Sequence, residues 1–216
     1  MTANQNSKKL RGDHMKDRFS GVVHGITRIV LTTPLRRLWG CHVIGAENLP
    51  AQGPAIFASN HASYLDPMIL GISYAGNIRW MAKAELWKVP VFRWLIEKLG
   101  AFPVKRGKPD REALRKAREL LEARKVLGMF PQGTRIKGED LGEAFPGVGM
   151  IALSEDIPVI PIRVRGHDQV FRQGIPRFPA ITITVGEPLN LKITGMSKGR
   201  AAEEAANRIM AAIKDL

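Results

Sequence analysis

One junction near residue 60 constrains the fold more than any other stretch of this sequence. A short apolar run at residues 54–58 leads directly into the polar stretch Ser59–Pro67, and a second apolar segment follows at residues 68–72. A short apolar run of this kind, bounded by turn residues, is typical of a strand that ends where a helix begins. Because α/β enzymes keep their sites at the ends of strands, we take the polar stretch as a candidate site.

His61 and Asp66 stand in this stretch with four residues between them. A neutral imidazole can take a proton from an alcohol when a carboxylate fixes its tautomer and stabilises the imidazolium. No protein nucleophile is evident beside the pair, so the hydroxyl would belong to the substrate. A structural interpretation competes, because Asp66 as an N-cap and Pro67 as the first helical residue need no catalytic role. The spacing alone leaves both interpretations open.

The charge of the chain narrows the class of partner. Among 216 residues, 33 Lys and Arg face 20 Asp and Glu, a formal net charge of +13. Such a surface favours nucleic acid, phospholipid or a phosphorylated small molecule. The single cysteine, Cys41, excludes an internal disulfide and a cysteine-rich metal site, and fits a reducing compartment. We expect neither a secretory signal nor a transmembrane span, since no apolar run is long enough.

Three parts of the chain are distinguished by pattern. Residues 1–18 are polar and mixed in charge, whereas apolar residues recur at helical spacing between Phe19 and Val30. We predict a polar tail at 1–18, an amphipathic membrane-associating helix at 19–39 and one α/β domain at 40–216. A helix that only packs on the domain would show the same stripe.

Two further apolar stretches carry local predictions. The segment 85–95 is helical in period and contains Trp87 and Trp94, so we predict contact with a membrane or an acyl chain, although Trp is also a common core residue. The run from Ile157 to Val164 is interrupted by prolines, which predicts an edge strand or a bulge.

A second polar constellation follows the predicted strand at 126–130. Pro131–Arg135 supplies a glycine, a hydroxyl and a guanidinium. The planar guanidinium matches two phosphate oxygens, and N–H groups of a glycine turn add further donors. Lys105 and Arg106 follow another short strand. In a mostly parallel sheet these strand ends share one edge with the first junction, which predicts an anion site there, whereas either motif alone fits a solvated surface turn.

Four blocks in one order carry a family resemblance: Asn60–Pro67 with the pattern NHxxxxD, Gly100–Arg106, Phe130–Arg135 and Val159–Ile162. On these blocks the chain resembles the glycerolipid acyltransferase family and is most similar to the lysophosphatidate acyltransferases. The resemblance implies a single α/β domain, with a mixed, mostly parallel sheet flanked by helices and an N-terminal helical element on the bilayer.

The resemblance also implies a reaction. His61, oriented by Asp66, would deprotonate the free hydroxyl of a lysophospholipid, which attacks the thioester of acyl-CoA or acyl-carrier protein without an acyl-enzyme. The implied acceptor is 1-acyl-sn-glycerol-3-phosphate and the product phosphatidic acid. The arginines hold the acceptor phosphate, and the candidate substrate-binding residues together are Asn60, Lys105, Arg106, Gln132, Gly133, Thr134 and Arg135.

The expected setting follows from the same resemblance. We expect no bound cofactor and no metal, an anionic membrane surface as partner, and a peripheral or monotopic position at the cytoplasmic face of the cell membrane. Two departures from the family pattern, Gln132 in place of Glu and Pro146 in place of Lys, leave open another lysophospholipid or glycolipid acceptor.

Two other classes of function compete with the enzyme. The positive charge suits a non-catalytic lipid- or nucleic-acid-binding protein, but no helix-turn-helix, zinc-ligand spacing or RNA-recognition motif supports it, and we expect no nucleic-acid partner. A metallohydrolase would need His61, Asp66 and a further histidine such as His167 as ligands, and the chain has no His-x-x-x-His pattern.

Overall fold

A computed structural model describes most of the chain from residue 40 onward. The described residues are 37, 40–98, 100–105, 110–136, 138, 140–155, 157–172 and 175–216. The predicted tail at 1–18, the predicted helix at 19–39 apart from Arg37, and the candidate phosphate ligand Arg106 lie outside them.

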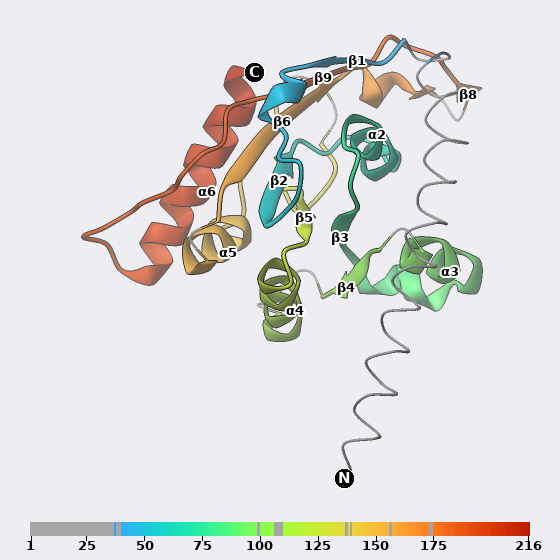
Figure 1. Cartoon of the computed structure of the whole chain (residues 1–216). Helices are drawn as coiled ribbons and strands as arrows, with labels where there is room; N and C mark the ends of the chain where they lie inside the picture. Colours follow the sequence, from blue (N-terminus) through green and yellow to red (C-terminus); the bar gives the residue numbers. More distant parts are fainter. Residues whose placement is uncertain are drawn as a thin grey trace.

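Seven strands form the main sheet, in the order β1-β9-β6-β2-β5-β3-β4 (Figure 1). Their bounds are β1 His42–Ile44, β2 Ala55–Ser59, β3 Ile78–Lys83, β4 Phe102–Val104, β5 Val126–Met129, β6 Val159–Arg165 and β9 Thr182–Val185. The five strands from β6 to β4 are parallel, whereas β9 pairs antiparallel with β6 and parallel with β1. This confirms the prediction of a mixed, mostly parallel sheet.

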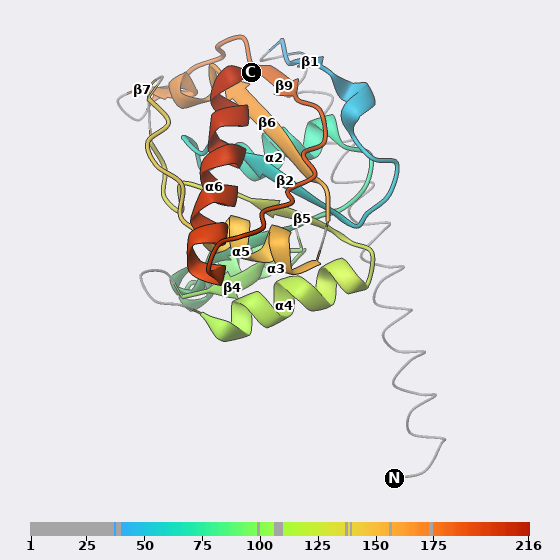
Figure 2. The same ribbon diagram turned by 90° about the vertical axis from the view of Figure 1, so that its left-hand side faces the viewer.

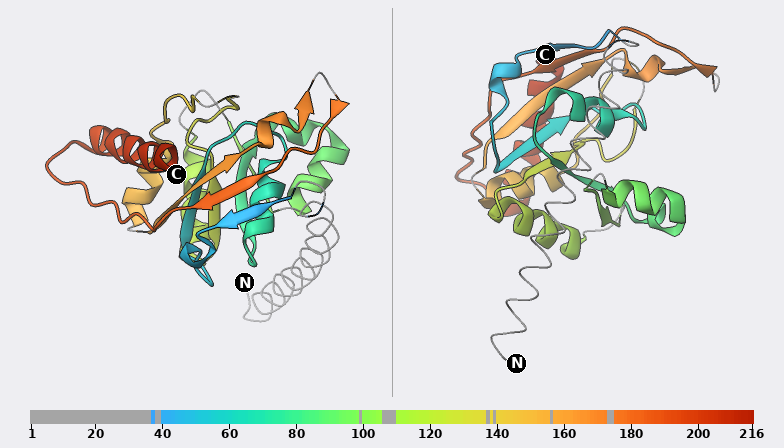
Figure 3. Two further views of the ribbon diagram at one scale, coloured as in Figure 1. Left: turned by 90° about the horizontal axis from the view of Figure 1, so that it is seen from above. Right: turned by 45° about the vertical axis from the view of Figure 1, so that its right-hand side comes forward.

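Helices cover both faces of the sheet, with α2 and α6 on opposite sides (Figure 1). The helices are α2 Asp66–Ser73, α3 Pro90–Lys98, α4 Arg111–Glu122, α5 Gly147–Glu155 and α6 Lys198–Asp215. Short 3₁₀ turns occupy η1 Ala46–Asn48, η2 Ala84–Lys88 and η3 His167–Gln169. A two-stranded pair, β7 Phe171–Arg172 and β8 Ile175–Pro176, extends beyond the main sheet (Figure 3). No helix within this described part is long and apolar enough to cross a bilayer.

The apolar core lies on both sides of β2, whose five residues are all buried. Phe57 belongs to the core beneath α2, and Ile56 belongs to the core on the other face, beneath α4, α5 and α6. Figure 2 shows these three helices in front of the sheet. Gly149 lets α5 approach α6, because a Cβ there would meet the Ala202 carbonyl oxygen. An apolar strand that is buried on both faces is the central element, so its carboxyl end is fixed in position.

The prediction of an edge strand for the proline-bracketed run is wrong, whereas the alternative of a bulge agrees with the strand pairing. That run is β6, which lies inside the sheet between β2 and β9. Pro161 pairs with Ala58 of β2, and its carbonyl accepts from Gly186 N–H at 2.8 Å. On this side Val159 pairs antiparallel with Leu189 and Ile162 with Val185, so three steps along β6 oppose four steps of the neighbouring chain. The missing N–H of Pro161 falls in this irregular stretch.

Candidate active site

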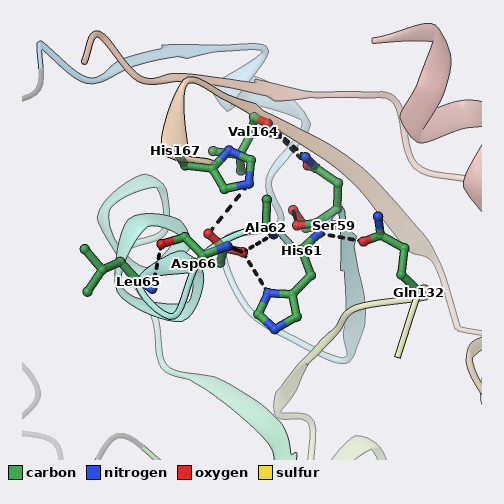
Figure 4. Close-up of polar contacts among 10 residues, drawn as sticks. Ser59, His61, Ala62, Leu65, Asp66, Gln132, Val164 and His167 are labelled. Carbon is green, nitrogen blue, oxygen red and sulfur yellow. Dashed lines mark hydrogen bonds and ion pairs between the residues drawn. The ribbon is translucent and has the colours of Figure 1, made fainter. Parts of the chain in front are cut away.

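His61 and Asp66 meet in the loop between β2 and α2 (Figure 4). The His61 Nδ1 atom lies 2.7 Å from Asp66 Oδ2, and the same oxygen accepts the N–H groups of Ala62 at 2.9 Å and Ser63 at 3.0 Å. An ionised carboxylate only accepts hydrogen bonds, so the proton between the two side chains belongs to His61 Nδ1. Figure 4 shows the other ring nitrogen, Nε2, pointing away from Asp66. With the proton on Nδ1, Nε2 is the ring nitrogen whose lone pair can accept a proton.

The start of α2 differs from the predicted N-cap arrangement. The helix begins at Asp66 itself, Leu65 is its N-cap, and no side chain caps it. The Asp66 carboxylate is fully buried and folds back to accept the two N–H groups of the loop. The residue thus shapes the loop that carries His61 in place of capping the helix that follows.

The His61 ring is held by stacking as well as by its hydrogen bond. It lies parallel to the Phe130 ring, with centroids 4.0 Å apart, and Phe130 stacks in turn on Trp80 at 5.2 Å. Phe130 comes directly after β5, and Trp80 belongs to β3. Neighbouring strands therefore fix the plane of the imidazole, and its side chain retains 10% exposure.

Asn60 uses its whole amide group to join β2 to β6. Its Nδ2 donates to the Val164 carbonyl at 2.9 Å, and its Oδ1 accepts from Val164 N–H at 2.8 Å. The side chain is buried. Because its two hydrogen bonds join it to the backbone of β6, it continues the pairing of β2 with β6 beyond Ser59. In the structure both polar atoms of Asn60 bond to β6, and its predicted contact with a substrate stays a prediction.

Gln132 likewise faces inward. Its Oε1 accepts the His61 backbone N–H at 2.6 Å, and its Nε2 donates to the Leu141 carbonyl at 2.7 Å. The Ile136 N–H donates to the His61 carbonyl at 2.8 Å, so the loop after β5 holds His61 by both backbone groups. Gln132 is only 1% exposed and each of its amide atoms bonds to backbone, so the structure gives it a role in holding His61, and its predicted substrate contact stays a prediction.

Thr134 and Arg135 remain exposed at the same edge of the sheet. The guanidinium carbon of Arg135 lies 3.4 Å from the centroid of the Tyr64 ring, and Tyr64 is part of the loop between His61 and Asp66. A cation over an aromatic face is attracted by the ring quadrupole. The stacking therefore brings the guanidinium to the loop that carries His61.

Gly133 and Lys105 complete the described anion-binding candidates. Gly133 has a φ of +63°, and a Cβ there would lie 3.0 Å from the Phe145 ring, so the turn requires glycine. Lys105 follows β4, which is separated from β2 by β5 and β3. Three strand spacings put it about 14 Å along the edge from the end of β2. Lys105 shares the edge with the other candidates without contacting His61.

His167 is the residue that the site prediction left out, since it entered only as a metal ligand of a rival function. Its Nε2 lies 3.7 Å from Asp66 Oδ1, and the side chain is buried. Burial lowers the pKa of His167, outweighing the opposite effect of Asp66 and Asp168. One signal in the sequence could have indicated its position. His167 follows β6, and β6 lies next to β2 in a parallel sheet, so the ends of both strands share one edge. Among the described residues no three His, Cys, Asp or Glu side chains form a group that could hold a metal ion.

The comparisons with known proteins agree with this fold and these blocks. The family model described as Acyltransferase matches residues 40–165. The 1-acyl-sn-glycerol-3-phosphate acyltransferase of Bacillus subtilis is 30% identical over 155 residues, which cover 70% of this chain and 74% of that protein. The chloroplastic enzyme of that name, BAT2, from Brassica napus is 28% identical over 86% of this chain, which spans only 54% of the plant protein.

A solved structure has the same fold. The 1-acyl-sn-glycerophosphate acyltransferase of Thermotoga maritima superposes with a TM-score of 0.63 at 22% identity, over 89% of this chain and 82% of that one. The family match runs from β1 to the end of β6. It therefore includes the His61–Asp66 pair and the turn that carries Gly133, Thr134 and Arg135. This chain belongs to the acyltransferase family, as its four sequence blocks predicted.

Proposed function

We propose that this protein transfers a fatty acyl group from acyl-CoA or acyl-carrier protein to the free hydroxyl of 1-acyl-sn-glycerol-3-phosphate, forming phosphatidic acid. One observation carries the proposal: the His61 ring is bonded to a buried Asp66 through Nδ1 and turns Nε2 away from it. The names of the Bacillus and Brassica relatives support the substrate class. Membership of the acyltransferase family supports the type of reaction.

In this mechanism His61 is the general base. Its Nε2 accepts the proton of the acceptor hydroxyl while the hydroxyl oxygen attacks the thioester carbonyl carbon. The new C–O bond forms, the C–S bond then breaks, and the imidazolium returns the proton to the departing thiolate. Asp66 keeps the Nδ1–H tautomer in place and stabilises the imidazolium while it exists.

We assign the acceptor phosphate to the exposed part of the site. Arg135 supplies the planar guanidinium, the turn at Gly133 and Thr134 supplies N–H and hydroxyl groups, and Lys105 and Arg106 extend the positive edge. The exposure of Arg135 beside the His61 loop supports this assignment. A phosphate bound by Arg135 would lie beside the loop that carries His61.

We further propose that the protein works on the cytoplasmic face of the cell membrane. The net charge of +13 suits an anionic lipid surface, and Trp94, at the predicted contact segment, is 64% exposed on α3. Val89, in the turn before α3, is also exposed. In this proposal the helix at 19–39 adds an interfacial anchor to the domain at 40–216.

A product screen tests the proposal. The full chain is incubated with lysophosphatidate, another lysophospholipid or monoacylglycerol, each with acyl-CoA or acyl-carrier protein, and products are identified by mass spectrometry. We expect phosphatidic acid from lysophosphatidate and no transfer to the phosphate-free monoacylglycerol.

Two variants make the screen specific. His61→Ala should yield no product, whereas His42→Ala, which changes an exposed histidine of β1, should behave as the parent. Preference for another lysolipid would correct the acceptor alone. Transfer to no acceptor by the parent chain, or undiminished transfer by His61→Ala, would overturn the proposal.

A further inference from the structure

The two oxygens of Asp66 are used unequally. Oδ2 receives three donors, whereas Oδ1 is buried and has no hydrogen-bond partner among the described residues. The nearest complementary group is His167 Nε2 at 3.7 Å, and that nitrogen also lacks a hydrogen bond within the same part of the chain. Figure 4 shows the His167 ring on the opposite side of the carboxylate from His61.

The two unsatisfied groups complement each other. A buried carboxylate oxygen without a donor is costly, and a shift of less than about 1 Å would bring Nε2 within hydrogen-bond distance. Three titratable groups act on His167. Asp66 lies next to its ring, Asp168 is the next residue in the chain, and His61 lies on the far side of the Asp66 carboxylate. Burial keeps the ring neutral, and the Nε2–H tautomer is the one that places a donor towards the carboxylate.

We propose that His167 is a positioning residue for acyl transfer, which donates from Nε2–H to Asp66 Oδ1 and so holds the carboxylate between two histidines. The inference rests on the proposed function, in which His61 is the base. His167 itself is buried behind Asp66 and does not touch the substrate.

This second hydrogen bond fixes the rotation of the Asp66 carboxylate, so that Oδ2 stays in line with His61 Nδ1. Loss of the donor should therefore lower kcat, with KM nearly unchanged, because the base is misplaced and the substrate-binding groups are not.

A matched pair of variants tests the inference. In His167→Gln the side-chain NH₂ reaches the place of Nε2, whereas in His167→Asn it is one methylene too short. Both replacements are neutral, polar and smaller than histidine. We expect Gln to keep kcat within about twofold, and Asn to lose about tenfold in kcat with KM within about twofold. Thermal unfolding of both variants shows whether each is folded at the assay temperature.

Several outcomes would overturn the inference. If both variants lose activity only in proportion to stability, so that Gln does not keep the kcat that Asn loses, His167 is a core residue alone. In side-chain ¹⁵N–¹H spectra of the folded parent chain, a proton on His167 Nδ1 in place of Nε2 would also exclude the proposed bond, whatever the activity. A His61→Ala variant in the same assays separates the cases, since retained transfer there refutes the proposed function and leaves the spectra to decide on His167.

Discussion

The inner and outer parts of the candidate site are held in different ways. The inner part, Asn60, His61, Asp66 and Gln132, is buried and bonded to backbone or ring on nearly every polar atom. The outer part, Thr134, Arg135 and Tyr64, is exposed, and its guanidinium rests on an aromatic face. Buried polar groups must be satisfied within the protein, whereas exposed ones are satisfied by water or ligand. The proposed base is therefore preorganised, and the proposed phosphate grip can adapt to its substrate.

The charge of the inner part offers the largest test of this difference. In Asp66→Asn the amide oxygen can still accept from Ala62, Ser63 and His61, so the loop should keep its shape. The negative charge that stabilises the imidazolium is lost, and the amide nitrogen takes the place of Oδ1 opposite His167. We expect kcat to fall by about 10³-fold, measured as phosphatidic acid formed, with KM little changed. A loss in kcat below about tenfold would mean that the buried carboxylate is structural. The inner part of the site would then not be the part that holds the base.

Arg135→Ala tests the outer part, with an effect on a different quantity. We expect kcat/KM for lysophosphatidate to fall by about 10- to 100-fold, mainly through KM, because a hydrogen-bonded charge partner of the phosphate is removed. The free energy of unfolding should change by less than about 0.5 kcal/mol, since the side chain is exposed.

Tyr64→Ala gives a graded form of the same test. Removing the ring beneath the Arg135 guanidinium should raise KM by only about two- to fivefold, the size expected of an exposed cation–π contact. A fall in kcat with constant KM in either variant would place these residues with the base and not with the phosphate.

The free energy of unfolding should distinguish the inner part of the site, which contains Gln132, from the outer part, which contains Thr134. Gln132→Ala leaves the His61 N–H and the Leu141 carbonyl without their partners, so urea unfolding should show a loss of about 1–3 kcal/mol. Gln132→Glu keeps the acceptor for His61 but sets an oxygen against the Leu141 carbonyl, and should also destabilise. Thr134→Ala, two residues along and exposed, is the matched control and should stay within about 0.5 kcal/mol. Equal losses at both positions would remove the distinction between the parts.

The pH dependence of stability offers the smallest test. Burial lowers the pKa of His167 below its ordinary 6.5, so the unfolded chain takes up this proton more readily than the folded one. The resulting stability is complete above pH 6.5 and is lost as the pH falls through the folded pKa. His167→Gln lacks this proton uptake, so its unfolding free energy should approach that of the parent in acid. A constant difference between the two chains across this range would show that the folded state does not keep His167 neutral.

The sequence was sufficient where a local pattern determined the structure. The apolar run at 54–58 predicted a strand that leads into the stretch with His61, and parallel pairing of β2 with β5 brought Arg135 to the same edge. The Asp110 cap of α4 is local in the same way, since its side chain accepts from the N–H groups of Glu112 and Ala113, two and three residues along.

Contacts between distant parts of the chain could not be read in this way. The direction of Gln132 depends on the Leu141 carbonyl nine residues on, and that of Asn60 on Val164 in a strand more than a hundred residues away. The same long-range pairing of β2 with β6 puts His167 behind Asp66. Roles for Arg106 and for the helix at 19–39 stay predictions, because they lie outside the described residues.

The central claim is that His61 Nε2 takes the proton from the acceptor hydroxyl. Its most direct test is the kcat/KM of His61→Ala for lysophosphatidate, measured beside the exposed-histidine control His42→Ala and with unfolding curves for both. The account predicts a loss of at least about 10³-fold in the first variant and none in the second, with both chains folded. Phosphatidic acid formation by His61→Ala within about tenfold of the parent rate would contradict it.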